Sequence, residues 1–527
     1  MSREPDLHTF SYPVVDVFAG PGGLGEGFAA LNRDETHSRA FKNILSIERD
    51  KHAHSTLLLR HFFRHFPDGE APDEYYDYLR GGVCREELFS SYCQEAKAAE
   101  ASAVRLSLKP DNHKKVSRLI KKRLGKSGSW VLVGGPPCQA YSLVGRSRMR
   151  SDPDFEKDER HFLYREYLQI ISEHRPPVFV MENVKGLLSA RVREKLMIDR
   201  ILADLSNPVS AFTGKKNGLS YSLYSLSEPD IPSEEADPRS FLVRAEEFGV
   251  PQARHRIFIV GVRSDIDIKP KGLKPHDAPT LGETISELPR VRSGLSSRGG
   301  SRQADDLVTW KKEIGKLSKM RFKRALRGAE HASELTGSIE MLSASGDFAT
   351  ERFSNRYRRP RPTNHAAISM LGDSRLNVLT GHEARSHMGS DLRRYAYAAT
   401  FAEVAKRSPK LSDFPEALLP NHRNVDEGCK GEMFSDRFRV QLREKVSTTI
   451  TSHISKDGHY FIHYDPKQCR SLTVREAARL QTFPDNYKFE GPRTAQYHQV
   501  GNAVPVYLAR QIAEIIADVL DRAGEIS

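Results

Sequence analysis

The stretch YPVVDVFAGPGGLGEGFAALN, residues 12–32, decides the fold of this chain. Its apolar start, VVDVF, predicts a buried strand. Five glycines follow between Gly20 and Gly27, and FAAL then predicts the opening of a helix. A strand, a glycine-rich turn and a helix in this order begin a doubly wound α/β unit. The glycines allow a ligand to approach the backbone closely, but the spacing is neither a P-loop nor the usual dinucleotide fingerprint.

Further strands continue this pattern along the first half of the chain. Apolar segments at 43–50, 130–138, 177–188 and 256–263 predict strands, and residues 161–177 have helical spacing. Strands that alternate with helices predict a mostly parallel sheet with ligands at the carboxyl ends of its strands. The second strand ends in Glu48, an acid placed as ribose recognition requires.

The composition is that of a soluble globular protein large enough for two or three domains. The chain has 527 residues, 38% hydrophobic and 28% charged. A net charge of +12 and a pI near 9.3 favour a polyanionic partner such as nucleic acid. No apolar run suits a membrane helix or a signal peptide. The five cysteines form no CxxC pair, which predicts reduced thiols, an intracellular location and no metal site.

The composition of the sequence becomes more basic, and its α/β pattern stops, near residue 290. Residues 302–327 hold nine Lys/Arg against three Asp/Glu, and RYRRPRP follows at 356–362. We therefore expect an irregular basic domain at 291–440, between a catalytic domain at 1–290 and a returning part at 441–527. Segment 382–409 looks helical, and its arginines either contact phosphates or face solvent. In the returning part we expect a helix that begins at Ser471 or Thr473 and ends before a proline, and then an amphipathic final helix.

A rigidly held thiol is the main chemical feature. In LVGGPPCQAYS, residues 132–142, two prolines fix the backbone before Cys138 at a predicted strand end. A lone cysteine there is as often a small buried hydrophobe. However, Glu182 ends the next strand, and Arg254 and Arg256 stand two apart in GVPQARHR. Because a buried carboxyl is normally paired, we expect these four groups to converge at one sheet edge.

Six motifs, in content and order, resemble the DNA cytosine-5 methyltransferase family of bacterial restriction-modification type. They are DVFAGPGG, GGPPCQAYS, ENV, QARHR, RSLTVREAARLQTFPD and QVGNAVP. The resemblance covers roughly residues 12–50, 130–190, 219–290 and 440–520. It implies a Rossmann-like, S-adenosylmethionine-dependent methyltransferase sheet, with 291–440 as the target recognition domain.

The resemblance also implies a role for each residue. Cys138 adds to C6 of a flipped-out cytosine, Glu182 protonates N3, and Arg254 and Arg256 hold the carboxylate and the base. The residues implied to bind S-adenosylmethionine are Phe18, Gly20, Gly22, Gly23, Leu24, Glu48, Pro137, Asn502 and Ala503. Those implied to bind the substrate are Gln139, Ser142, Asn183 and Gln252, and the loop through GRSRMR, residues 145–150, closes on phosphates.

One departure and several alternatives stay open. The family has an acid at its third strand, and here either VRLSLKPDN or GGVCREEL could supply it. An RNA (tRNA) cytosine-5 methyltransferase keeps the chemistry, but the long basic region favours DNA. A non-catalytic nucleic-acid-binding protein disagrees with the intact catalytic set, and an oxidoreductase explains only the first 50 residues. We expect a monomeric cytoplasmic prokaryotic enzyme that acts on double-stranded DNA beside a cognate restriction endonuclease.

Overall fold

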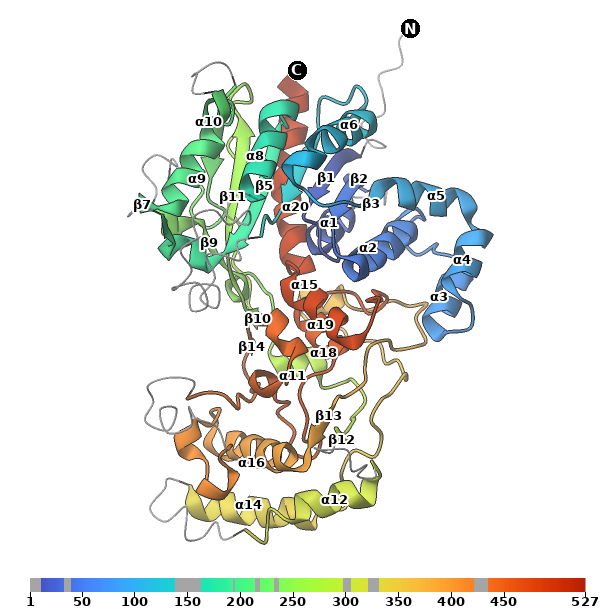
Figure 1. Ribbon diagram of the computed structural model, residues 1–527, viewed down its shortest axis with the longest axis vertical. Coiled ribbons are helices and arrows are strands. Elements are labelled where there is room, and N and C mark those ends of the chain that lie inside the picture. Colours follow the sequence, from blue (N-terminus) through green and yellow to red (C-terminus); the bar gives the residue numbers. More distant parts are fainter. Residues whose placement is uncertain are drawn as a thin grey trace. The chain divides into compact units, whose positions relative to one another are not determined.

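The computed structural model describes residues 11–32, 39–137, 163–192, 195–213, 219–231, 237–296, 305–320, 331–420 and 435–526 (Figure 1). The chain forms two compact units. The first contains Met1–Asp277, Phe489–Gly491 and Ala503–Ser527, and the second contains Ala278–Lys488 and Pro492–Asn502. Each unit is described by itself below.

The first unit is built on a mixed sheet of eight strands among the described residues. The strand order is β3-β2-β1-β4-β5-β11-β8, and β9 also pairs with β11. The pairs from β3 to β5 are parallel, whereas β11 is antiparallel to its neighbours. The strands are β1 (Tyr12–Val17), β2 (Phe41–Glu48), β3 (Ala103–Arg105), β4 (Val131–Gly134), β5 (Val178–Val184), β8 (Tyr221–Tyr224), β9 (Leu242–Arg244) and β11 (His255–Arg263). This order confirms the predicted Rossmann-like α/β class.

Helices cover both faces of the sheet. One face packs against α6 (His113–Leu124), α8 (Leu163–His174) and α9 (Met197–Ser206) in a continuous apolar core. On the other face α1 (Gly23–Ala29) contacts β2, and the final helix α20 (Val506–Ile526) packs on α1 (Figure 1). Further helices follow β2, namely α2 (Lys51–Arg64), α3 (Asp73–Arg80), α4 (Arg85–Ser91) and α5 (Cys93–Ser102). A helix from near the beginning of the chain, α1, and the last helix, α20, therefore lie in one layer of the first unit.

The second unit has a helical core and few strands. Its helices include α11 (Leu281–Ile285), α12 (Leu307–Gly315), α14 (Ala332–Ala344), α15 (Ala366–Ser369), α16 (Gly389–Ala405), α18 (Val474–Leu480) and α19 (Arg493–Asn502). The short strands β12 (Gly294–Ser296) and β13 (Ser386–Met388) pair in parallel. The core gathers apolar side chains of α12, α14 and α16 around the fully buried Trp310.

Helix α16 corrects the expectation for segment 382–409. Only 389–405 is helical, and most of its side chains, Tyr395 and Tyr397 among them, are buried in the core. Its arginines are engaged within the unit: Arg393 binds Glu313 at 2.6 Å and Arg394 binds Asp391 at 2.7 Å. The helix is thus not a solvated charged helix, and contact of its arginines with phosphates stays a prediction. The charge pattern of the segment could not reveal the pairing of Arg393, because its partner Glu313 lies far away in the sequence.

The motif RSLTVREAARLQTFPD forms a buried ionic framework in the second unit. Thr473 caps α18 in a reciprocal capping box with Glu476, which decides between the two expected helix starts. Arg470 holds Glu476 through two contacts of 2.6 and 2.7 Å and also donates to the Val291 carbonyl. Burial raises the pKa of Glu476, but Arg470 outweighs it and holds this pKa below its usual range.

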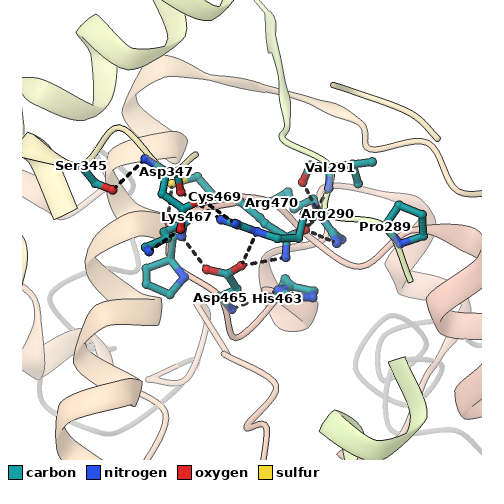
Figure 2. A network of polar contacts seen from close by, with 12 residues as sticks. Pro289, Arg290, Val291, Ser345, Asp347, His463, Asp465, Lys467, Cys469 and Arg470 are labelled. Carbon is teal, nitrogen blue, oxygen red and sulfur yellow. Dashed lines mark hydrogen bonds and ion pairs between the residues drawn. The ribbon is translucent and has the colours of Figure 1, made fainter. Parts of the chain in front are cut away.

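A second polar network lies beside Arg470, as Figure 2 shows. Arg290 lies 2.9 Å from Asp347 and 3.4 Å from Asp465, and Lys467 binds Asp347 at 2.7 Å. Segments distant in the sequence are therefore fastened by charge pairs as well as by the apolar core. Among the described residues, no helix has the length and apolar character needed to cross a membrane.

Candidate active site

Strand register brings the predicted site residues to one edge of the sheet. The residues Ile47, Val17, Gly134 and Met181 stand side by side on β2, β1, β4 and β5. The next residue along each of these chain segments is Glu48, Phe18, Gly135 and Glu182, respectively. All four lie at the carboxyl ends of parallel strands, where α/β sheets bind ligands.

The glycine-rich turn has a backbone that is fitted for close approach by a ligand. Phe18 adopts a left-handed conformation with φ 58°, which is strained for a bulky side chain, and Gly20 and Gly22 follow with φ 58° and 99°. Gly22 is the N-cap of α1, with no side chain to cover the first helical N–H groups. Such strain at a non-glycine residue marks a functional turn when the surrounding fold maintains it. Leu24 is buried inside α1.

Glu48 lies directly beside this turn. One carboxylate oxygen accepts from the Gly20 N–H at 2.8 Å and the other from the Asp50 N–H at 2.7 Å. These two bonds fix the carboxylate and leave acceptor capacity for a further pair of hydroxyl groups. The predicted ribose contact therefore agrees with the position of Glu48 and stays a prediction.

The end of the chain supplies residues next to the turn. A Cβ on Gly23 would lie 2.5 Å from the Val504 carbonyl oxygen and 3.2 Å from the Ala503 Cβ. Ala503 is thus packed against the first turn of α1. Asn502 is exposed and ends α19 in the second unit, so its predicted cofactor contact is not tested by this geometry.

The loop that leads to Cys138 lies against Glu182. A Cβ on Gly135 would stand 2.7 Å from Oε2 of Glu182, so a side chain at this position would have to displace the carboxyl. Asn183 donates to the Pro136 carbonyl at 3.3 Å and accepts from the Val184 N–H at 2.8 Å, which fastens the loop to β5. Pro137 is half-buried and is the last residue described before the gap. Cys138, Gln139, Ser142 and the segment 145–150 lie outside the described residues.

Two arginines surround the Glu182 carboxyl. Arg256 Nε lies 3.1 Å from Glu182 Oε1, and these two side chains are 15% and 13% exposed. Arg254 is 1% exposed, and its N–H donates to the carbonyl of the fully buried Gln252 in β10 (Gln252–Ala253). Burial raises the pKa of Glu182, although the charges of Arg256 and Arg254 oppose it. The site therefore combines a carboxyl that gains protons easily with two cationic hydrogen-bond donors.

Sequence reasoning missed two acids of the glycine-rich segment. Asp16 on β1 is fully buried, and burial raises the pKa of its carboxyl to about 8, although a hydrogen bond from the Gly25 backbone opposes this shift. Glu26 on α1 binds Arg60 and Arg64 of α2 at 2.5 Å each. An acid within a buried apolar strand was the available signal for Asp16. Nothing local in the sequence marks the partners of Glu26.

Strand β3 lies next to one of the two segments that could supply the expected adenine-contacting acid, and the choice between them stays a prediction. Strand β3 ends at Arg105, so VRLSLKPDN follows this strand, whereas GGVCREEL connects α3 with α4. The acid of that segment is Asp111, in a short 3-10 helix, Pro110–Asn112, and it pairs with Lys109 at 3.0 Å. The strand end itself carries a basic residue, which is a departure from the family pattern.

Comparisons with known proteins find relatives that match most of this chain. The family model for C-5 cytosine-specific DNA methylase matches residues 105–518. The type II methyltransferase M.Bpa9945I of Bacillus paralicheniformis is 31% identical over 96% of this chain and 99% of its own length. M.AgeI of Thalassovita gelatinovora is 26% identical over 95% of this chain and 98% of its own. The DNA (cytosine-5-)-methyltransferase M.ApeKI of Aeropyrum pernix is 26% identical over 74% of this chain and 81% of its own.

The sheet order, the convergent Glu182 and arginines, and the extent of these matches define a methyltransferase that acts on DNA. The chain belongs to the C-5 cytosine-specific DNA methylase family and is a DNA cytosine-5 methyltransferase of restriction-modification type. The resemblance found in the six sequence motifs is thereby confirmed.

Proposed function

We propose that this enzyme transfers the methyl group of S-adenosylmethionine to C5 of a flipped-out cytosine in a specific duplex DNA sequence, through a covalent Cys138 adduct. The observation that carries the proposal is the meeting of Gly135, Glu182 and Arg256 at the strand edge beside the glycine turn. S-adenosylmethionine supplies an electrophilic methyl group when it is bound. The remaining chemistry belongs to residues of the chain.

The glycine turn fits this cofactor. The left-handed Phe18 and Gly20, the uncovered N-terminus of α1 and the fixed Glu48 carboxylate lie together at one strand end. Glu48 would accept from the ribose hydroxyls, and Phe18 would pack on the adenine. Gly20, Gly22, Gly23 and Leu24 would line the methionine part, and Pro137, Asn502 and Ala503 would close the pocket.

The cytosine must be made nucleophilic at C5. The Cys138 thiolate forms a bond from Sγ to C6, and the electron pair of the C5–C6 double bond moves toward the ring nitrogen N3. Glu182 in its protonated form donates a proton to N3, so that C5 becomes an enamine carbon able to take the methyl group. Loss of the C5 proton to a base then expels the Cys138 thiolate and restores the C5–C6 double bond, and N3 returns its proton to Glu182.

The two arginines act on the same step. Arg256 orients the Glu182 carboxyl by its 3.1 Å contact, and Arg254 holds the base oxygen O2. Burial of both guanidiniums keeps water from the adduct and strengthens their effect. Asn183 and Gln252 hold the loop and the arginine segment in place and would border the base, while Gln139 and Ser142 would contact the DNA backbone.

The biological setting that follows is protection of DNA. Members of restriction-modification systems methylate sites that a cognate endonuclease would otherwise cut, so we propose this role in the cytoplasm of a prokaryote. We further propose that the enzyme acts as a monomer and that residues 291–440 recognise the target sequence. The endonuclease is a functional partner and need not bind the methyltransferase.

Label transfer tests the proposal. Purified enzyme is given tritiated S-adenosylmethionine with unmethylated plasmid, with the same plasmid carrying 5-methylcytosine at every cytosine, or with bulk tRNA; Cys138→Ser is the matched control. Label that enters only the unmethylated plasmid, and disappears with the substitution, supports the proposal. Label in tRNA would transfer the function to RNA. Label in the fully methylated plasmid would exclude C5 as the acceptor.

A further inference from the structure

One segment of the second unit carries several arginines, and only those at its two ends are paired with acids among the described residues. Residues 351–361 contain five arginines and one acid, Glu351. Arg352 at one end binds Asp305 at 2.8 Å, and Arg361 at the other binds Glu287 at 2.7 Å. The three between them, Arg356, Arg358 and Arg359, are exposed, and their side chains form no ion pair with any described residue.

These three arginines differ from several other described arginines of the second unit. Arg290, Arg393 and Arg470 are each bound to a carboxylate. A surface cation without a partner costs nothing in water, but three on one short segment create a concentrated positive field. The same segment exposes Phe353, whose side chain is 61% accessible. Arginine beside an exposed aromatic ring is a composition suited to nucleic acid.

The backbone of the segment is firmly held. Phe353 and Arg356 form antiparallel bridges with Glu383 and Val378, and the Ser354 N–H donates to the His382 carbonyl at 3.1 Å. The Tyr357 hydroxyl accepts from the Asp373 N–H at 3.2 Å. Residues 353–359, called the ribbon below, therefore have a fixed main chain that carries exposed side chains.

The segment opposite this ribbon, residues 378–383, is fastened to the buried ionic framework. Arg475 of α18 donates to the Thr380 carbonyl at 2.9 Å and to its hydroxyl at 2.8 Å, and the Arg475 N–H donates to the Gly381 carbonyl. His382 lies 3.0 Å from the Thr473 hydroxyl and 2.7 Å from the Pro289 carbonyl oxygen. The motif RSLTVREAARLQTFPD thus serves as the base that supports the ribbon.

We propose that the ribbon Phe353–Arg359 is a docking surface for duplex DNA, in which Arg356, Arg358 and Arg359 each bind a phosphate and Phe353 contacts the bases. The inference rests on the proposed function and names the surface by which its substrate is held. Of the acids near the ribbon, Glu383 is paired with Arg493 at 3.2 Å, and Asp373, which accepts from the Asn486 amide at 2.7 Å, is a single charge against three arginines.

Salt dependence of binding tests the surface. Each phosphate neutralised adds about 0.9 to the slope of log affinity against log salt. Between about 50 and about 200 mM KCl, the wild type should therefore lose about 40-fold more affinity than Arg356→Gln/Arg358→Gln/Arg359→Gln. The probe is a fluorescein-labelled duplex of mixed sequence, followed by anisotropy. Phe353→Ala should weaken binding without changing the slope.

The matched control removes three exposed lysines of the same unit, Lys312→Gln/Lys319→Gln/Lys456→Gln. An equal change of slope in this control, or no change in the arginine variant, would overturn the assignment. Binding of S-adenosylmethionine measured by calorimetry should be unchanged in every variant. If the wild type transfers no methyl group to any DNA while the slope difference persists, the proposed function fails and the DNA surface stands.

Discussion

Loss of the Glu26 charge should destabilise the first unit by about 3 kcal/mol. The carboxylate of Glu26 is 1% exposed and binds Arg60 and Arg64, whose side chains are 6% and 14% exposed. Burial raises the pKa of Glu26, but the two guanidinium charges outweigh it and lower this pKa from 4.5 to about 2. A shift of that size corresponds to about 3 kcal/mol between the charged and neutral carboxyl. Glu26→Gln removes the counter-charge that Arg60 and Arg64 share, although Arg64 keeps its 2.9 Å pair with Asp68; removing one partner of a buried ion pair costs about 3–5 kcal/mol in other proteins.

The assay is urea unfolding followed by tryptophan fluorescence. The chain has two tryptophans, Trp130 in the first unit and Trp310 in the second. In a Trp310→Phe background the signal reports the first unit alone. The control is Glu247→Ala, because Glu247 and its partner Arg244 are 52% and 56% exposed, and such a pair contributes less than about 1 kcal/mol.

The pH dependence has a defined sign. Because the folded-state pKa of Glu26 is lowered, its stabilisation is fully present above about pH 4.5 and is lost as the pH falls toward 2. The wild type should therefore lose more stability over this interval than Glu26→Gln. If the substitution costs less than about 1 kcal/mol, or the two proteins lose stability in parallel, the account of this buried pair is refuted.

Three further predictions concern the active site. Gly135→Ala places a methyl group 2.7 Å from the Glu182 carboxyl, so the rate of methyl transfer should fall about 100-fold while calorimetry shows unchanged cofactor binding. The control is Gly128→Ala, because a Cβ there has no neighbour within 4 Å. Equal activities of the two variants would contradict the geometry. Gly23→Ala meets the Val504 carbonyl at 2.5 Å and should weaken S-adenosylmethionine binding at least about tenfold by calorimetry, and unchanged affinity would show that the turn yields. Since burial raises the pKa of Glu182, its proton-donating form persists to higher pH; the single-turnover rate should fall as pH rises through this pKa, and Glu182→Gln should lose that limb of the profile.

Much of the first unit could be predicted from the sequence because its signals are local. The apolar runs became β1, β2, β4, β5 and β11, and the 161–177 pattern contains α8 at Leu163–His174. The strand-end positions of Glu48 and Glu182 followed from the same runs. Register then aligned them with Phe18 and Gly135, which the spacing of each segment alone could not show.

The parts that could not be predicted depend on contacts between distant residues. Helix α16 looked like a charged surface helix, yet its arginines pair with Glu313 and Asp391, and its aromatic side chains form the core of the second unit. The partners of Glu26, Arg60 and Arg64, lie on α2, which is separated from α1 by strand β2 in the sequence. Helix α20 packs on α1, and the periodicity of the sequence could not show this contact because the two helices lie near opposite ends of the chain.

Trapping of the covalent adduct tests the central claim most directly. A duplex in which the target cytosine carries fluorine at C5 has no C5 proton to lose, so the enzyme should remain bonded to it after methyl transfer. The wild type with S-adenosylmethionine should form a complex that survives denaturation, and mass spectrometry of its peptides should place the bond on Cys138, with none formed by Cys138→Ser. A stable adduct on another residue, or methyl transfer by Cys138→Ser at the wild-type rate, would contradict the account.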